Sequence, residues 1–155
     1  MGFFYTFTTM TIVLATTNNL ENLSVLFNRY RVFYKQPSDI ERAKQFLSER
    51  LLRKDSIIFM ALSDAGEAMG FTQLYPSFSS VSTQRTYILN DLYVSEVHRN
   101  KGIGEALMER AKQFAISEGA KGITLETEVN NPAQHLYERL GWKKDDDKFH
   151  YTWEI

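Results

Sequence analysis

The chain has 155 residues, of which 43% are hydrophobic and 24% are charged, a composition that fits one globular domain with a single core. Its formal net charge of −1 provides no overall positive field, so no nucleic-acid partner is expected. The absence of cysteine excludes disulfides, thiolate metal sites and a cysteine acyl-enzyme, and it fits a reducing, cytoplasmic location.

The first ten residues, MGFFYTFTTM, are apolar but lack the charge pattern of a targeting segment. A signal peptide carries positive charge before its apolar stretch, whereas the first basic residue here is Arg29. Gly2 and Thr6 match the myristoylation pattern only formally, with three aromatic residues between them. No run approaches the ~20 apolar residues of a membrane span, so no membrane partner is expected. We interpret 1–10 as an N-terminal extension of one domain covering 1–155, or as the product of a start codon upstream of Met10.

The first half of the chain predicts a strand, two helices and a hairpin. A short apolar run at 11–16 predicts the strand, and apolar residues at helical spacing follow a cap at Asn18 or Asn19. Pro37 ends this first helix, and Ser38 with Glu41 predicts a capping box that starts the second. Strands are then predicted at 56–62, 68–75 and 85–94, the first two joined by a turn and the last two by a loop at 77–83.

The second half predicts helix, strand, helix and a closing strand. The helix at 102–118 has the clearest apolar stripe of the chain, and 122–129 alternates as a strand does. Asn131 at the cap and Pro132 in the first turn open a last helix that ends at Gly141. Aromatic residues with a period of two in the tail, 142–155, favour a closing strand. The order predicts an α/β fold of the mixed α+β kind, with a mixed sheet, a parallel pair and helices on both faces.

A candidate anion-binding loop lies between the strand at 85–94 and the following helix. Two glycines, Gly102 and Gly104, stand where that helix exposes unpaired N–H groups and a partial positive charge. Arg99 and Lys101 add cationic donors. The loop is neither the dinucleotide fingerprint, because Leu107 replaces the third glycine, nor a Walker loop. Spacing alone leaves open a helix that merely begins with glycines.

The whole segment resembles the pyrophosphate loop of the GNAT acetyltransferases. Its six residues are Arg99, Asn100, Lys101, Gly102, Ile103 and Gly104, which resemble the family's R-x-x-G-x-G motif. The preceding 89–94, and then 126–131, Tyr137-Glu138 and 140–142, follow the family in order and spacing, so that the resemblance covers about 85–142. It implies the GNAT fold, acetyl-CoA as cosubstrate and transfer of an acetyl group to an amine.

Acetyl transfer to an amine requires a base, an acid and donors for the carbonyl oxygen. An alkyl amine has a pKa of about 10 and is mostly protonated at neutral pH, so a proton must leave before it attacks. With no cysteine and no G-x-S-x-G elbow, direct attack in a ternary complex is the natural route. Tyr137 is the expected general acid, because the resembling enzymes carry a tyrosine there that protonates the thiolate. A purely packing role for Tyr137 is the alternative.

Three carboxylates are candidates for the base. Asp91 comes first, since polyamine-type members of the family use an acid at the position of Asn90 or Asp91 and an asparagine cannot act as a base. Glu126 follows, and Glu128, on the same face of its strand, comes last; both could also be solvated surface acids.

The resemblance also implies binding residues. Backbone N–H groups of Leu92, Tyr93 and Val94 are expected to hold the acetyl carbonyl, and Asn131 is expected to contact the cofactor arm. The first two helices line the acceptor site in such enzymes, so Phe33 and Tyr34 could stack on a cationic acceptor. No metal is expected, because His98, His135 and His150 have no ligand spacing.

The strands at 71–75 and 89–94 resemble the branch with polyamine-type and histone-type enzymes. That branch favours a polyamine, a lysine-like amine or a basic peptide as acceptor. Because GNAT domains often pair through their C-terminal strands, the resemblance also implies a homodimer, which the aromatic tail at 149–153 permits but does not require. Two other functions stay open from the sequence. One is a non-catalytic acyl-CoA-binding or regulatory domain on the same fold. The other is a nucleotide-binding module that uses the 99–104 loop, which the missing motif residues disfavour.

Overall fold

The computed structural model describes residues 9–155. Contacts within the chain separate it into two compact units, one ending at Leu125 and one spanning Glu126–Ile155, and each is described by itself. The myristoylation pattern and most of the expected N-terminal extension lie outside the described residues. None of the helices within 9–155 combines the length and apolarity that crossing a bilayer requires.

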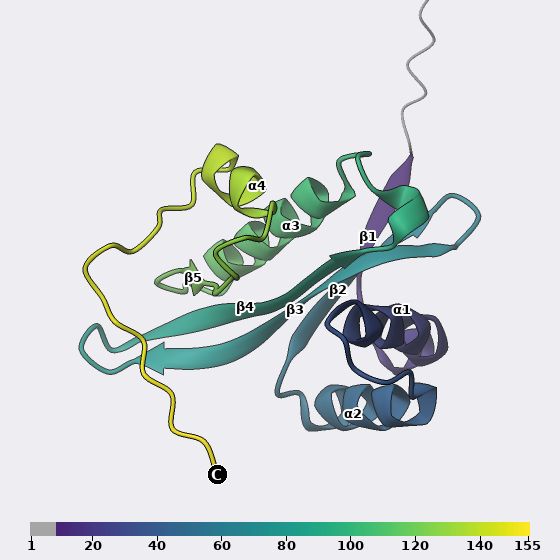
Figure 1. Ribbon diagram of the computed structural model, residues 1–155, viewed down its shortest axis with the longest axis horizontal. Coiled ribbons are helices and arrows are strands. Elements are labelled where there is room, and N and C mark those ends of the chain that lie inside the picture. The colour runs from purple at the N-terminus through teal and green to yellow at the C-terminus, as the bar shows by residue number, and fades with distance from the viewer. Residues whose placement is uncertain (1–8) are drawn as a thin grey trace, which may run out of the picture. The chain divides into compact units, whose positions relative to one another are not determined.

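A mixed sheet of five strands forms the frame of the first unit (Figure 1). The strands are β1 (Met10–Leu14), β2 (Ile57–Ser63), β3 (Ala68–Ser79), β4 (Gln84–Val94) and β5 (Ile123–Thr124). They follow one another across the sheet in chain order, the first four antiparallel and the last pair parallel. This confirms the predicted mixed sheet with a parallel pair.

Helices cover both faces of this sheet, as predicted. The first two, α1 (Leu20–Phe33) and α2 (Ile40–Arg53), pack on one face, and α3 (Ile103–Ser117) packs on the other (Figure 1). The cap before α1 is confirmed in part. Asn19 accepts a hydrogen bond from the backbone N–H of Thr16 at 2.9 Å, but the two residues close a short 3₁₀ turn, Thr17–Asn19, that leads into the helix.

The predicted capping box of Ser38 and Glu41 is wrong. Asp39 caps α2 instead, its side chain accepting from the N–H of Arg42 at 3.0 Å. The reason is a tertiary contact from α1: Asn28 donates to the Ser38 hydroxyl and accepts from the Asp39 N–H, both at 2.9 Å. With Ser38 held by Asn28, the next residue takes over the cap.

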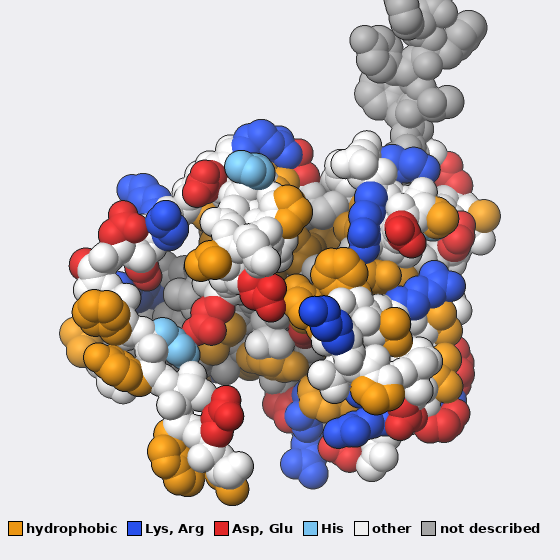
Figure 2. Space-filling model, in the orientation of Figure 1, with side chains coloured by type: hydrophobic (Ala, Val, Ile, Leu, Met, Phe, Trp, Pro, Cys, Tyr) orange, Lys and Arg blue, Asp and Glu red, His pale blue; other side chains and the backbone are white. Residues whose placement is uncertain are grey.

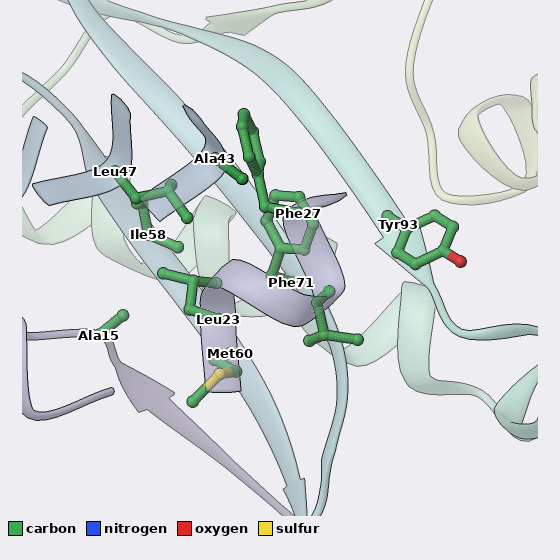
Figure 3. Packing of buried hydrophobic residues seen from close by; sticks show 10 residues of the cluster. Ala15, Leu23, Phe27, Ala43, Leu47, Ile58, Met60, Phe71 and Tyr93 are labelled. Atoms are coloured by element: carbon green, nitrogen blue, oxygen red, sulfur yellow. The ribbon is translucent and has the colours of Figure 1, made fainter. Parts of the chain in front are cut away.

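The face under α1 and α2 is packed with large apolar side chains (Figure 3). Alternation along β2 sends Ile58 and Met60 to this face and Phe59 to the other, where its ring lies 5.7 Å from that of Phe114 on α3. Phe27 of α1 packs on Phe71 of β3 with ring centroids 5.9 Å apart. Because the side chains on the α1 face, those of Phe27, Ile58, Met60 and Phe71, are all buried, the two helices fix the position of the sheet beneath them.

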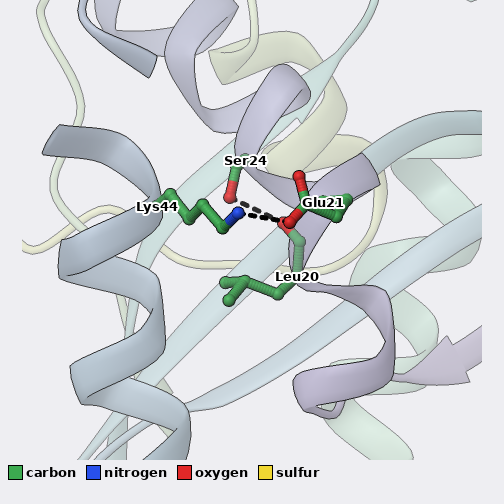
Figure 4. A network of polar contacts seen from close by, with 4 residues as sticks. All are labelled: Leu20, Glu21, Ser24 and Lys44. Carbon is green, nitrogen blue, oxygen red and sulfur yellow. Dashed lines mark hydrogen bonds and ion pairs between the residues drawn. The ribbon is translucent and has the colours of Figure 1, made fainter. Parts of the chain in front are cut away.

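The outer surface of α1 and α2 carries ion pairs of the ordinary solvated kind. Glu21 of α1 pairs with Lys44 of α2, next to the Ser24 hydroxyl, which donates to the carbonyl of Leu20 at 2.6 Å (Figure 4). Figure 2 shows acidic and basic side chains mixed over these two helices. Exposed pairs of this kind contribute little to stability, so the apolar core is the main contact that holds α1 against α2.

The predicted strand at 122–129 is mostly wrong, because only Ile123 and Thr124 pair with a neighbour. Beyond Leu125 the chain belongs to the second unit, and Val129 is 94% exposed there. Alternating side chains alone do not make a strand, since its backbone groups need a partner along the whole ladder.

The second unit contains one short helix, α4 (Gln134–Arg139). It begins later than predicted, because Asn131 and Pro132 form turns first: Asn131 accepts from the Ala133 N–H at 3.0 Å. Gly141 ends it as expected, with a φ of 87° and the Trp142 N–H donating to the Tyr137 carbonyl at 3.0 Å.

The predicted closing strand is wrong. No strand is present in 142–155, and Phe149, Tyr151 and Trp153 are each at least 85% exposed. As at 122–129, alternation is present in the sequence but no partner strand satisfies the backbone.

Candidate functional site

A β-bulge in β4 decides which side chains reach the face covered by α1 and α2. Gln73 of β3 lies opposite Asp91, and Leu74 lies opposite Leu89, so Asn90 is an extra residue on β4. The insertion reverses the alternation of faces. Before it, Tyr87 packs on Phe114 of α3, with centroids 5.3 Å apart. After it, Tyr93 packs on Tyr30 of α1 at 6.0 Å, so Asp91 shares the α1 face with Gln73 and Tyr93.

Asp91 is a buried carboxylate, 3% exposed, surrounded by hydrogen-bond donors. The side-chain amide of Gln73 donates to Oδ2 at 2.6 Å, and that of Asn90 donates to Oδ1 at 3.1 Å. The Tyr30 hydroxyl forms a further hydrogen bond to the carboxylate. Within 9–125 no lysine, arginine or histidine forms an ion pair with it. The negative charge is therefore solvated by dipoles but has no counter-charge in this unit.

Two tyrosines beside this carboxylate keep their protons over a wide pH range. Burial, followed by the negative charge of Asp91 and its hydrogen bond, raises the pKa of Tyr30 well above its usual range. Burial and the charge of Asp91 also raise the pKa of Tyr75 to about 12. Both phenols remain donors at neutral pH, and their aromatic rings border the carboxylate.

The backbone of β4 beyond the bulge has an open edge. The Ser95 N–H donates to the Met69 carbonyl of β3 at 2.9 Å. Because backbone groups alternate in direction along a strand, the N–H groups of Leu92 and Val94 point away from β3. In the described residues β5 pairs with β4 only at Tyr87 and Ile88, so no strand covers that edge at Leu92 and Val94. These N–H groups are free to donate hydrogen bonds to a carbonyl oxygen of a ligand.

The loop after β4 forms a short turn and then the start of α3. Gly102 has a φ of 78°, a left-handed conformation that glycine adopts without strain, and it offers no side-chain cap. The start of the 15-residue helix is therefore not capped by the side chain of its N-cap residue. Asn100, at φ 61°, is also left-handed, and Lys101 is exposed. The geometry fits a phosphate ligand.

Arg99 links this loop to α1. Its Nε donates to the Val94 carbonyl at 3.0 Å. Its guanidinium lies 5.4 Å from the ring centroid of Phe33 and 5.7 Å from that of Tyr93. Figure 3 shows Tyr93 at the end of the apolar cluster with its hydroxyl directed away from it. The Arg99 guanidinium is thus positioned by cation–π contacts with two aromatic rings.

The two aromatic residues predicted to bind the acceptor lie at the end of α1. Phe33 is 58% exposed and Tyr34 43%, and their ring centroids are 5.2 Å apart. The first unit therefore brings together Asp91, the 92–94 backbone, the 99–104 loop and the end of α1. Ile103 is the exception among the loop residues, because its side chain is buried in the core and only its backbone is available.

The second unit carries the remaining predicted residues. Tyr137 lies on α4, half-buried, with its ring 6.3 Å from that of Trp142. Asn131 holds the turn before α4. Glu126 is exposed and pairs with His150 at 3.1 Å, and Glu128 is exposed as well. Of the three candidate bases, only Asp91 is buried.

The sequence reasoning missed Gln73, Tyr30 and Tyr75 as members of the polar cluster. The sequence held a signal for Gln73, because it is the one amide side chain in the predicted strand segment from Phe71 to Tyr75. The sequence could not distinguish Tyr30 from an ordinary core residue, because its ring packs in the core and only its hydroxyl reaches Asp91. Within 9–155 no cluster of three or more acidic, histidine or cysteine side chains offers a metal site.

Comparison with known proteins agrees with this geometry. The model of the acetyltransferase (GNAT) family matches residues 20–142. An uncharacterized N-acetyltransferase of Bacillus subtilis (strain 168), YhfO, is 48% identical over 147 residues, covering 94% of this chain and 98% of its own length. A probable acetyltransferase of Haemophilus influenzae is 32% identical over 132 residues, which are 77% of this chain and 90% of that protein.

Solved structures agree as well. The crystal structure of a probable acetyltransferase superposes with a TM-score of 0.89 at 43% identity, covering 94% of this chain and 97% of the other. The family match spans α1 to the end of α4 and includes the bulge and the uncapped start of α3. The chain belongs to the GNAT family of acetyltransferases, whose cosubstrate is acetyl-CoA.

Proposed function

We propose that the chain transfers an acetyl group from acetyl-CoA to a primary amine by direct attack in a ternary complex. The observation that carries the proposal is the buried carboxylate of Asp91, held by the bulge on the α1 face next to the open edge of β4. Family membership gives the cosubstrate, and the position of Asp91 supports an acceptor that carries a positively charged amine. The acceptor class is a polyamine, a lysine-like amine or a basic peptide.

The cosubstrate supplies an acetyl group that is already activated as a thioester. Its pyrophosphate is assigned to the N–H groups at the start of α3 and to Arg99, Asn100 and Lys101. The uncapped helix start and the left-handed Gly102 fit such an anion. Asn131 is assigned to the cofactor arm.

The chain's own residues remove a proton from the amine, stabilise the charge on the carbonyl oxygen and protonate the leaving sulfur. Asp91 takes the proton that the ammonium must lose before the nitrogen can attack. The N–H groups of Leu92 and Val94, with Tyr93 between them, hold the carbonyl oxygen on which negative charge develops as the C–N bond forms. Tyr137 gives its proton to the sulfur as the C–S bond breaks, and the nitrogen, which still carries one proton too many after the attack, releases that proton as the amide forms. Glu126 is the alternative base, and Phe33, Tyr34 and Glu128 are assigned to the outer part of the acceptor site.

The test is release of free thiol from acetyl-CoA across a panel of acceptors. The panel contains spermidine, putrescine, lysine, a histone-like basic peptide and an aminoglycoside. Because the chain has no cysteine, every thiol detected comes from coenzyme A. Release that depends on one class of amine identifies the acceptor. A melting temperature raised by acetyl-CoA, with no release for any acceptor, argues instead for an acyl-CoA-binding domain.

A further inference from the structure

A second buried polar atom lies beside Asp91 and is unused by the proposed reaction. Gln73 is fully buried, and its amide nitrogen donates to Asp91 at 2.6 Å. Its carbonyl oxygen, Oε1, is also buried and has no hydrogen-bond partner. A buried acceptor without a donor costs free energy, so native proteins seldom leave one unpaired without a reason.

Asp91 and Gln73 both have acceptor positions that no donor of the described chain fills. The carboxylate receives three hydrogen bonds but has no counter-charge within 9–125, and no donor reaches Oε1 of Gln73. A carboxylate has about four lone-pair positions and an amide oxygen has two, so at least one on each group stays open. A ligand that carries both a positive charge and N–H donors satisfies both groups at once.

From this we infer that Asp91 and Gln73 form a binding position for an ammonium group, with Gln73 Oε1 accepting one of its N–H donors. Calling this nitrogen the reacting one rests on the proposed function. The position selects a primary amine, because an ammonium has three N–H donors to share between the two oxygens and each N-methyl group removes one. Tyr30 and Tyr75 add aromatic rings, and their hydroxyls stay protonated and leave the carboxylate as the only anion of the cluster.

Neighbouring charges do not supply the missing cation. Arg50, the cation of α2 whose charge acts on Tyr75, is paired with Asp55 at 2.9 Å. Arg99 donates to Val94 and stacks on aromatic rings. Both guanidinium groups have partners of their own, so the ammonium of the acceptor is the charge that completes the cluster.

The direct test observes Gln73 itself. In the ¹⁵N-labelled full chain, its side-chain amide signals are assigned by their loss in Gln73→Met. Methylammonium chloride is then titrated against tetramethylammonium chloride, which has the same charge and no N–H donor. We expect a saturable shift of the Gln73 signals with methylammonium alone. Equal shifts for both salts, or none for either, overturn the ammonium position.

The kinetic test uses the acceptor that the thiol assay identifies. Gln73→Met should raise the acceptor KM by at least about tenfold and leave the acetyl-CoA KM unchanged, as expected for loss of a hydrogen bond to a charged group. Thr72→Val is the matched control: Thr72 is equally buried and donates to the Asp91 carbonyl at 2.8 Å, but its side chain is on the other face. An equal effect of both variants overturns the inference.

The experiments distinguish failure of the proposed acetyl transfer from failure of the proposed ammonium position. If methylammonium shifts Gln73 but no amine promotes thiol release, the ammonium position stands and the proposed acetyl transfer is overturned. If release occurs and primary and N-methylated forms of the acceptor have equal KM values, the transfer stands and the selectivity is overturned.

Discussion

At the residue scale, Asp91 and Glu126 are distinguished by burial. Asp91 is 3% exposed beside the open edge of β4, whereas Glu126 is exposed and paired with His150. Asp91→Asn, which keeps the shape and removes the base, should lower kcat/KM for the acceptor by about 10²-fold or more. Glu126→Gln should change it by less than about threefold, within the range of surface substitutions. The reverse ranking in steady-state assays would transfer the role of base to Glu126.

Tyr137 is expected to act on the leaving sulfur and not on binding. Tyr137→Phe removes one hydroxyl from α4, and kcat should fall by about 10²-fold with little change in the acetyl-CoA KM. Tyr151→Phe is the control, since Tyr151 is 87% exposed in the tail. Unchanged turnover in Tyr137→Phe would leave that tyrosine with a packing role against Trp142.

Tyr75 predicts how stability changes at high pH. Its pKa rises from 10.0 to about 12 in the folded chain, through burial first and the charge of Asp91 second. The unfolded chain therefore loses this proton earlier than the folded chain, and the stability contributed below pH 10.0 is lost as the pH approaches about 12. In Tyr75→Phe the free energy of unfolding, measured with urea at a series of pH values, should decline less steeply over this interval. Parallel declines would show that Tyr75 does not titrate differently in the two states.

At the element scale, the β3–β4 pair holds the bulge and depends on a close backbone approach. A Cβ on Gly70 would lie 2.7 Å from the Tyr93 carbonyl oxygen and 3.3 Å from the Val94 Cα, both backbone atoms. Gly70→Ala should therefore destabilise the fold by about 1–3 kcal/mol. It should also raise the acetyl-CoA KM, because 93–94 must move. Gly122→Ala is the control, since no atom of a residue beyond its two chain neighbours lies within 4 Å of its added Cβ. Denaturant midpoints that fall equally in both variants would contradict this account.

The elements also show what the sequence could and could not predict. Apolar periodicity was enough to predict the strands β1 to β4 and the helices α1 to α3, because each of these elements buries one face against a partner. The bulge was not predictable, since Asp91 stands two residues after Leu89 and plain alternation puts both on one face. The cap of α2 depended on Asn28, ten residues before Ser38. Predictions failed where the outcome depended on contacts distant in sequence.

At the scale of the whole molecule, the residues assigned to acetyl-CoA come from both compact units. The open edge of β4 and the start of α3 belong to the first, and Asn131 and Tyr137 to the second. The second unit has few buried contacts of its own, because α4 has no buried residue and the tail exposes its aromatic side chains. Few buried contacts correspond to fast local opening, so amides at 126–155 should exchange faster than those of β2 to β4.

Acetyl-CoA should change this exchange pattern in both units together. A ligand that binds only the folded state adds its binding free energy to stability, about 2.7 kcal/mol at a concentration of 100 times Kd. Hydrogen exchange followed by mass spectrometry should therefore show slower exchange at 99–107 and at 131–140 upon addition of acetyl-CoA, with 142–155 unchanged. Arg99→Ala should weaken both effects equally at a fixed concentration, because one binding event produces them. Protection confined to 99–107 would mean that the first unit binds the cofactor alone, and the roles assigned to Asn131 and Tyr137 would be withdrawn.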